Sequence, residues 1–257
     1  MTTQTYAIQR ETTHPQLPES GWQSVCKPGG IAALLIVLTA LTEILVTFLP
    51  GGYTTANSVT EWFALLQDNP FLGLRNLGLL NIVMTALGIP VIFSLYTVHK
   101  KVNQPFAALA MIISFIGVAV FYATNRAFPM LDLSVRYAAA TSEAQRTMIE
   151  AAGLAMLSVG QSHTPGTFLA VCLSIIGGIL MALVMLRGKL FNPVTALVGV
   201  IGYGFLLVYD VFASFMPSSH NVILIIALIG GLSNMAWYIM VAIRLFQLGK
   251  AKPAAAK

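Results

Sequence analysis

Two acidic residues lie inside long apolar stretches of the sequence. Glu43 falls in Ile31–Leu49 and Asp210 falls in Pro193–Met216. Each is about six residues, or roughly 9 Å, from the predicted outer end of its helix. A carboxylate in a membrane-spanning helix is costly, so it normally faces the interior of the bundle and marks a functional site. These two residues are therefore candidates for proton or cation binding, or for general acid–base chemistry.

Polar residues on the neighbouring helices complete a candidate site. Asn81 and Asn234 lie on polar stripes with small residues, and Arg75 and Arg126 lie at the outer ends of predicted helices. The sequence predicts a polar cavity that opens outward. Its candidate ligand-binding residues are Glu43, Arg75, Asn81, Arg126, Asp210 and Asn234.

A purely structural role stays open for each of these residues. Polar side chains with small neighbours also pack membrane helices together, and this interpretation is favoured for Asn81 and Asn234. For the carboxylates, the main alternative is a buried Glu43–Arg75 or Asp210–Arg126 pair that only locks the fold.

The elements that position these residues are long apolar helices. Of the 257 residues, 57% are hydrophobic and only 9% are charged, whereas a soluble domain has roughly a quarter charged residues. The predicted fold is an all-α membrane protein with six transmembrane helices, because blocks near 20 apolar residues are long enough to cross a bilayer. The predicted spans are 31–49, 77–97, 106–124, 168–186, 193–216 and 222–243.

The distribution of basic residues predicts the orientation. With the N-terminus inside, ten Lys and Arg residues fall on the cytoplasmic side and four on the outer side, in agreement with the positive-inside rule. We therefore predict a multi-pass protein of the cell membrane with both termini in the cytoplasm. Residues 1–30 and 250–257 are predicted to be cytoplasmic tails, the first disordered, flanking a membrane domain at 31–249.

Two outer segments carry helix-start signals. Ser58-Val-Thr-Glu61 and Ser142-Glu-Ala-Gln145 each have the spacing of a capping box. The first precedes a short amphipathic helix with Trp62 on its apolar face, expected to lie on the membrane surface. The second falls within Ala127–Pro165, which predicts an extracytoplasmic helical hairpin between the third and fourth spans.

Motifs for metal or cofactor chemistry are missing from the sequence. The four histidines lack the spacing of metal ligands, so we expect no metal and no cofactor, and no basic stripe indicates nucleic acid. His163 and His220 could approach each other beside Asp210, although an isolated loop histidine is usually just solvated.

The outer segment resembles a known family. The stretches Leu133–Arg146 and Ala151–Leu157, with Met185–Phe191 and Arg244–Gly249, resemble the bacterial integral membrane family catalogued as domain of unknown function 4386. The resemblance covers about Ile31–Gly249 and implies a bacterial inner-membrane protein. It implies no reaction and supplies no catalytic residues.

Three functions stay open at this point. The first is binding or transport of a small solute or amphiphile, with Glu43 and Asp210 as proton or cation partners and Arg75 and Arg126 as anion anchors. The second is an intramembrane enzyme that uses either carboxylate as its acid or base. The third is a non-catalytic subunit that docks a partner on the 127–165 hairpin. The lipid bilayer is the one partner that all three share, and the sequence does not indicate an oligomeric state.

Overall fold

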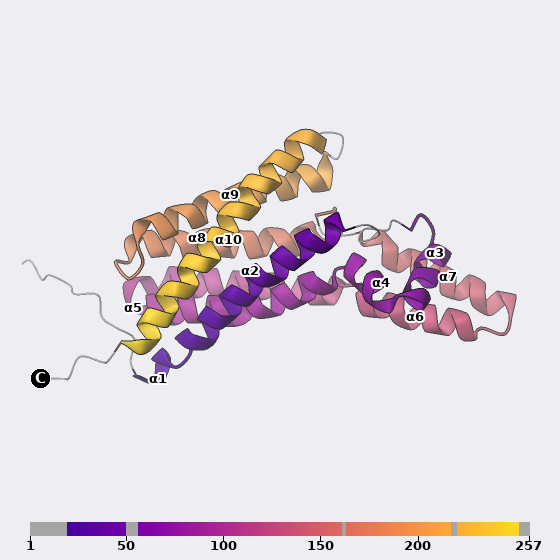
Figure 1. Cartoon of the computed structure of the whole chain (residues 1–257), viewed down its shortest axis with the longest axis horizontal. Coiled ribbons are helices and arrows are strands. Elements are labelled where there is room, and N and C mark those ends of the chain that lie inside the picture. Colours follow the sequence, from indigo (N-terminus) through magenta and orange to yellow (C-terminus); the bar gives the residue numbers. More distant parts are fainter. Residues whose placement is uncertain (1–19, 50–55, 161–162, 217–219, 252–257) are drawn as a thin grey trace, which may run out of the picture.

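Long helices form a bundle that accounts for most of the chain (Figure 1). The computed structural model describes residues 20–49, 56–160, 163–216 and 220–251, and over these residues it contains helices and no strands. Five of the described helices are long and apolar enough to cross a membrane. They are α2 (Cys26–Phe48), α5 (Leu79–Thr124), α8 (Phe168–Arg187), α9 (Pro193–Phe215) and α10 (His220–Lys250).

Helix α5 is folded back on itself. Its backbone leaves the helical region at Asn103 (φ −154°, ψ 79°). The break lies two residues before Pro105, which has no N–H to donate to the preceding turn and is suited to the first turn of a helix that begins again after the break. The Tyr122 hydroxyl donates to the carbonyl of Ile82 over 3.1 Å, so the two arms of α5 run antiparallel. These arms occupy the positions of the second and third predicted spans.

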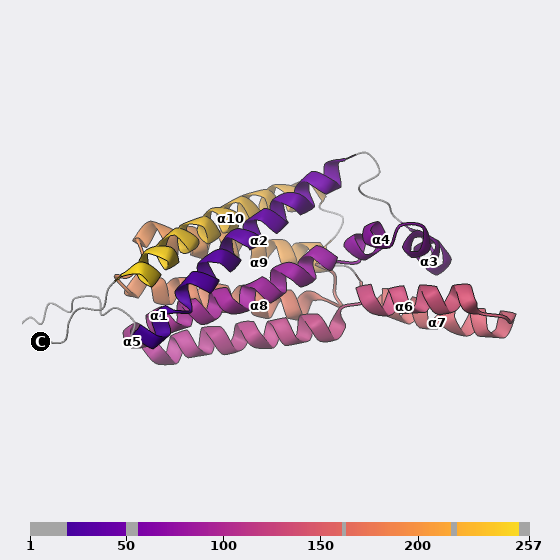
Figure 2. The ribbon, with the colours of Figure 1, turned by 60° about the horizontal axis from the view of Figure 1, so that its bottom comes forward.

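Shorter helices gather at one end of the bundle. These are α3 (Val59–Asp68), α4 (Pro70–Asn76), α6 (Ala127–Ala139) and α7 (Glu143–Ser158), and Figure 2 shows α6 and α7 projecting well beyond the long helices. Helix α1 (Ser20–Gln23) and the C-terminal end of α10 lie at the opposite end (Figure 1). A Cβ atom on Gly249 would lie 3.3 Å from the side chain of Lys27, so the two described ends of the chain are adjacent.

Both predicted helix caps form, with one difference. The Ser58 and Ser142 hydroxyls accept hydrogen bonds from the backbone N–H groups of Glu61 and Gln145, at 3.2 and 3.3 Å. The Glu61 and Gln145 side chains reach one residue further back than predicted. They accept from the backbone N–H groups of residues 57 and 141.

Two helix boundaries differ from the sequence prediction. Helix α2 begins at Cys26 and α1 precedes it, so residues 20–23 and 26–30 are helical where a disordered tail is predicted. Pro28 is compatible with this early start because N–H groups in the first turn have no helical partner. The remaining tail residues of the prediction, 1–19 and 252–257, lie outside the described residues. Gly78, with φ +97°, separates α4 from α5 inside the predicted 77–97 span.

The buried core has two parts. One part joins the long helices and includes the fully buried Leu95, Met181 and Trp237. The other is built from Trp62, Phe63 and Met130, among others, between α3 and α6. The apolar face of α3 therefore packs against protein, with Trp62 only 5% exposed. Trp62 therefore packs against α6 and not, as predicted, against lipid headgroups, whereas the position of α3 relative to a membrane stays a prediction.

Candidate functional site

A cavity of about 360 Å³ lies where the bundle meets the shorter helices. We name it the Arg126 cavity. Four of the six predicted site residues line it, namely Glu43 of α2, Arg75 of α4, Asn81 of α5, and Arg126 between α5 and α6. The main chain turns sharply at Gly78 and leaves the helix at Asn125, and these changes of direction bring side chains from three segments to one place.

Glu43 and Arg75 form an ion pair across the wall of this cavity. The Arg75 Nη2 atom lies 3.0 Å from Glu43 Oε1. The same guanidinium donates to the backbone carbonyl of Glu43, to the Thr47 hydroxyl and to the Asn76 side chain. The Arg75 side chain is 1% exposed and that of Glu43 is 35% exposed. Since Arg75 is held by several partners on α2 and by Asn76, the pair ties α4 to α2.

Arg126 is buried beside the cavity without a carboxylate partner among the described residues. It is 5% exposed, and its Nη1 atom donates to the carbonyl of Leu157 at the end of α7 over 3.0 Å. Burial lowers the pKa of the Arg126 guanidinium to about 10, so it stays protonated at neutral pH. A buried cation is normally matched by an anion, because desolvation costs several kcal/mol, roughly, per ion.

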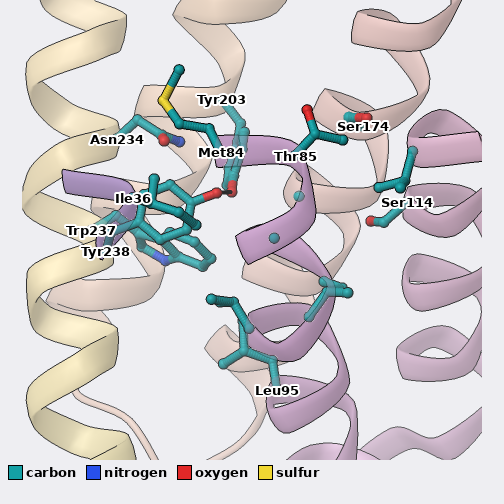
Figure 3. Close-up of a pocket in the computed structure, with 15 residues that line it drawn as sticks. Ile36, Met84, Thr85, Leu95, Ser114, Ser174, Tyr203, Asn234, Trp237 and Tyr238 are labelled. Atoms are coloured by element: carbon teal, nitrogen blue, oxygen red, sulfur yellow. Dashed lines mark hydrogen bonds between the residues drawn. The ribbon is translucent and has the colours of Figure 1, made fainter. Parts of the chain in front are cut away.

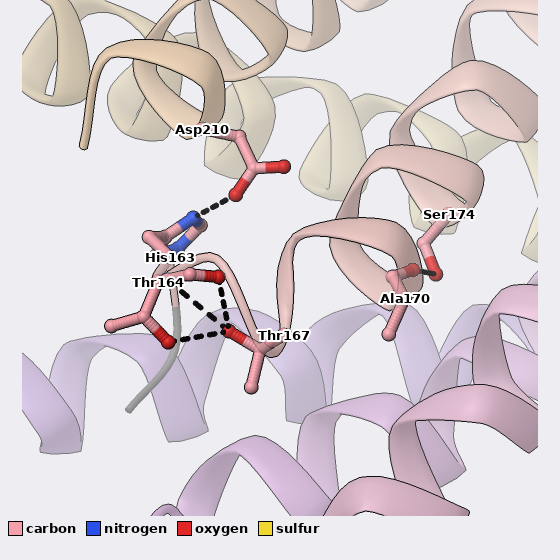
Figure 4. Close-up of polar contacts among 6 residues, drawn as sticks. All are labelled: His163, Thr164, Thr167, Ala170, Ser174 and Asp210. Atoms are coloured by element: carbon pink, nitrogen blue, oxygen red, sulfur yellow. Dashed lines mark hydrogen bonds and ion pairs between the residues drawn. The ribbon is translucent and has the colours of Figure 1, made fainter. Parts of the chain in front are cut away.

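Asp210 is fully buried on α9 and its partner is a histidine. Its Oδ1 atom lies 2.8 Å from Nδ1 of His163 (Figure 4). Its Oδ2 atom has no hydrogen-bond partner within the described part of the chain. Asp210 does not line the Arg126 cavity itself, whereas His163 does. The predicted Asp210–Arg126 pair is therefore replaced by an Asp210–His163 pair.

The local backbone holds His163 in place. Its φ of +60° lies in the left-handed region, which is uncommon for a residue with a side chain but enriched in histidine. The next turn is closed by Thr167, whose hydroxyl accepts from the backbone N–H of Thr164 over 3.2 Å (Figure 4). The Tyr209 ring packs against the imidazole at 4.5 Å. With Nδ1 directed at a buried carboxylate, the second ring nitrogen is left for a ligand or a proton.

Two further cavities lie deeper in the bundle, and the first of them shares lining residues with this site. A middle cavity of about 240 Å³ is lined in part by Asn81 and His163. A deep cavity of about 260 Å³ contains Asn234, the sixth predicted residue, beside Tyr203 and Trp237 (Figure 3). Asn234 is therefore not brought together with the four residues of the Arg126 cavity.

The comparison with protein families identifies the chain. The family described as Domain of unknown function (DUF4386) matches residues 31–244. The chain belongs to the DUF4386 family. No curated protein matches it, and no solved structure matches it.

In this DUF4386 protein, His163 is absent from the predicted site residues, although the sequence left open that it approaches His220 beside Asp210; the His220 side chain lies outside the described residues. An isolated loop histidine carries little signal, and only the turn at residues 163–167 brings it to Asp210. The predicted placement of His163 at the outer face beside Asp210 was the one indication in the sequence. Within the described residues, no group of three His, Cys, Asp or Glu side chains is arranged to hold a metal ion.

Proposed function

We propose that this protein spans the membrane six times and binds a small anionic ligand, a solute or an amphiphile, in the Arg126 cavity. The observation that carries the proposal is the buried guanidinium of Arg126, which lines the cavity and has no carboxylate within ion-pair distance among the described residues.

The two carboxylates near the cavity already have partners. Glu43 pairs with Arg75 at 3.0 Å and Asp210 pairs with His163 at 2.8 Å. A phosphate or carboxylate beside Arg126 would neutralise the remaining buried cation. The planar guanidinium can donate two parallel hydrogen bonds to such a group. The Asn81 and Asn125 side chains that share the cavity suit a ligand with further hydrogen-bonding atoms.

The proposed topology rests on the two arms of α5 and on charge. A straight helix of 46 residues would be about 69 Å long, more than twice the roughly 30 Å of a bilayer core. Folding at Asn103 makes each arm a separate crossing. Basic residues such as Lys27, Lys100 and Lys250 gather near the end that holds α1, which favours that end as cytoplasmic. The α6–α7 hairpin would then lie on the extracytoplasmic side. The membrane that the protein spans would be the cell membrane.

Binding can be tested with a charged amphiphile and its opposite. Decyl phosphate should raise the thermal unfolding temperature of the purified protein, followed by tryptophan fluorescence, whereas decyltrimethylammonium should not. The variant Arg126→Gln should lose most of the shift. Arg136→Gln is the matched control, because Arg136 is an exposed arginine paired with Asp132. Equal shifts in both variants and in the wild type would contradict the proposal.

A second candidate function is hydrolysis, favoured by the His163–Asp210 pair. A buried carboxylate that orients an imidazole is the arrangement of a general base. If an anionic ester lay in the cavity, water could attack it while the second ring nitrogen of His163 accepts the water proton. The leaving group would depart with the electron pair of the broken ester bond.

The chromogenic diester 4-nitrophenyl decyl phosphate tests this candidate. Hydrolysis would form decyl phosphate and release 4-nitrophenolate, which is followed by absorbance. His163→Gln and Asp210→Asn should abolish the release, while the exposed Asp132→Asn should not. Release that is unchanged in His163→Gln, or absent in the wild type, rejects the enzyme in favour of binding alone.

A further inference from the structure

We propose that the ligand is an amphiphile whose hydrocarbon chain enters the bundle through the middle and deep cavities. This inference rests on the proposed function for the anionic end of the ligand, which Arg126 holds. It adds the chemical class of the remainder of the molecule and the place where it lies.

The three cavities follow one another along α5. The Arg126 cavity and the middle cavity share Asn81, Phe121 and His163 in their walls. The middle and deep cavities share a further set, namely Met84, Thr85, Ser174, Tyr203 and Tyr238. From Asn81 to Leu95 at the far end of the deep cavity, α5 rises about 21 Å. A path of this length suits an alkyl chain.

The lining changes from charged to apolar along the path. Arg75, Arg126 and Glu43 line the first cavity. Among the described residues, no Asp, Glu, Lys or Arg lines the other two. The walls of the deep cavity are mainly aliphatic and aromatic, including Ile36, Met84, Val91, Ile92, Leu95 and Trp237 (Figure 3).

Several hydroxyl groups along the path already have partners in the protein. The Ser114 and Ser174 hydroxyls donate to carbonyls of their own helices, at Ala110 and Ala170. The Tyr203 hydroxyl donates to that of Tyr238 over 3.3 Å. A hydrocarbon chain beside them would leave these hydrogen bonds intact. In the deep cavity, Asn234 Nδ2 and Trp237 Nε1 have no hydrogen-bond partner among the described residues, so its inner walls are mainly apolar with these two polar atoms as exceptions.

The volumes agree with one extended ligand. Cavities for drug-sized ligands usually measure about 300–1,000 Å³. The middle and deep cavities, at about 240 and 260 Å³, are each smaller than that. Taken together the two reach this range, and they share walls with each other and, through the middle cavity, with the Arg126 cavity. His163 lies at the boundary between the anionic end and the chain, since it lines both of the first two cavities.

Gly88 offers a direct way to block the path. It lines the deep cavity, and a Cβ atom built there meets nothing within 4 Å, so a leucine at this position would extend into open space. Gly231 of α10 is the matched control. A Cβ atom there also meets nothing within 4 Å, and Gly231 lines none of the three cavities.

The experiment compares ethyl, hexyl and decyl phosphate by calorimetry on the full chain in nanodiscs of zwitterionic lipid. Each CH₂ buried in the path should tighten binding by up to about fourfold. Partitioning into the nanodisc lipid is the same for every variant. Gly88→Leu should keep the affinity for ethyl phosphate and lose at least tenfold for decyl phosphate, whereas Gly231→Leu should match the wild type.

The outcomes separate this inference from the proposed function. If Gly88→Leu binds decyl phosphate as tightly as the wild type, the proposed path of the hydrocarbon chain is wrong. The proposed anion site is tested separately, by the effect of Arg126→Gln. If no phosphate binds, decanol tests the path without an anion, and decanol binding unaffected by Gly88→Leu overturns it. Should Gly88→Leu fail to fold, Thr85→Leu, which lines both inner cavities, provides the same comparison.

Discussion

Each carboxylate in the long apolar helices is paired with a side chain from a different segment. Glu43 of α2 contacts Arg75 of α4, and Asp210 of α9 contacts His163, which lies between α7 and α8. The attraction within such a pair offsets the free-energy cost of desolvating its charges only when both members are present. The two pairs therefore connect the shorter helices and loops to the bundle, and they leave Arg126 as the buried charge that a ligand can match.

The Asp210–His163 pair should behave as one unit in stability measurements. Because Asp210 is fully buried, His163→Leu leaves an unmatched charge and should lower the free energy of unfolding by about 3 kcal/mol. The double variant His163→Leu/Asp210→Leu should recover most of that loss. Thermal unfolding of the purified protein measures both.

Exposed charges provide the control for this prediction. Asp132 and Arg136 form an ion pair with side chains 58% and 67% exposed. Substituting either should change stability by less than about 1 kcal/mol. If the effects of His163→Leu and Asp210→Leu simply add, the two side chains are not coupled and the pair has no special role.

Residues of the Arg126 cavity were predictable to different degrees. Glu43, Asn81 and the two arginines lie near the outer ends of strongly apolar segments, so counting residues from those ends places them at the same end of the bundle. The sequence left His163 beside Asp210 as one possibility but did not predict the pair, because a left-handed backbone at His163 has no sequence signal. Asn234 lies on a polar stripe of its own helix, and the stripe alone does not report how deep in the bundle Asn234 lies.

At the scale of elements, one glycine determines where α4 ends and α5 begins. The apolar pattern from Phe71 onward is that of a continuous helix, and the break at Gly78 arises from its φ of +97°. This turn aims Arg75 at α2 while Asn81 faces the cavity. Periodicity reports which face of a helix is apolar, and it does not report a single residue that leaves the helical region.

The same substitution should have opposite effects at two glycines of this region. A Cβ atom at Gly78 would meet only ordinary contacts at 3.8 Å, so Gly78→Ala should cost about 1 kcal/mol through its left-handed backbone alone. Gly88 is helical with open space around it, and Gly88→Ala should stabilise the protein by roughly 0.5–1 kcal/mol. Unfolding temperatures of the two variants give the signs, and a stabilising Gly78→Ala would contradict this view of the turn.

The cap of α7 should influence the site at a distance. The Ser142 hydroxyl accepts from the Gln145 N–H at the start of α7, and the Leu157 carbonyl at its end accepts from Arg126. Ser142→Ala should cost about 1 kcal/mol of helix stability and raise amide hydrogen exchange in residues 143–158. Thr147→Ala is a control, because its hydroxyl bonds only within the helix. Equal exchange in both variants would show that the cap does not limit the opening of α7.

For the whole molecule, the helices are arranged along one long axis (Figure 1). Helix α1 and the C-terminal end of α10 lie at one end of the bundle, and α6 and α7 extend from the opposite end (Figure 2). Composition was enough to predict an all-helical membrane protein. The packing of α3 on α6 was not predictable, because an amphipathic helix can bury its apolar face against lipid or against protein.

The proposed six crossings predict which loops are reached from each side of the membrane. With Cys26 and Cys172 replaced by alanine, single cysteines can be placed at three exposed positions, Gln104, Ser142 and Lys189. In intact spheroplasts, a membrane-impermeant maleimide should label Ser142→Cys, beside α7. It should label Gln104→Cys and Lys189→Cys only after permeabilisation. If each arm of α5 crosses the membrane, the break between the arms lies on the cytoplasmic side, as does the loop between α8 and α9. Labelling of Gln104→Cys together with Ser142→Cys in intact spheroplasts would contradict the two-crossing path, since both loops would then lie on one side.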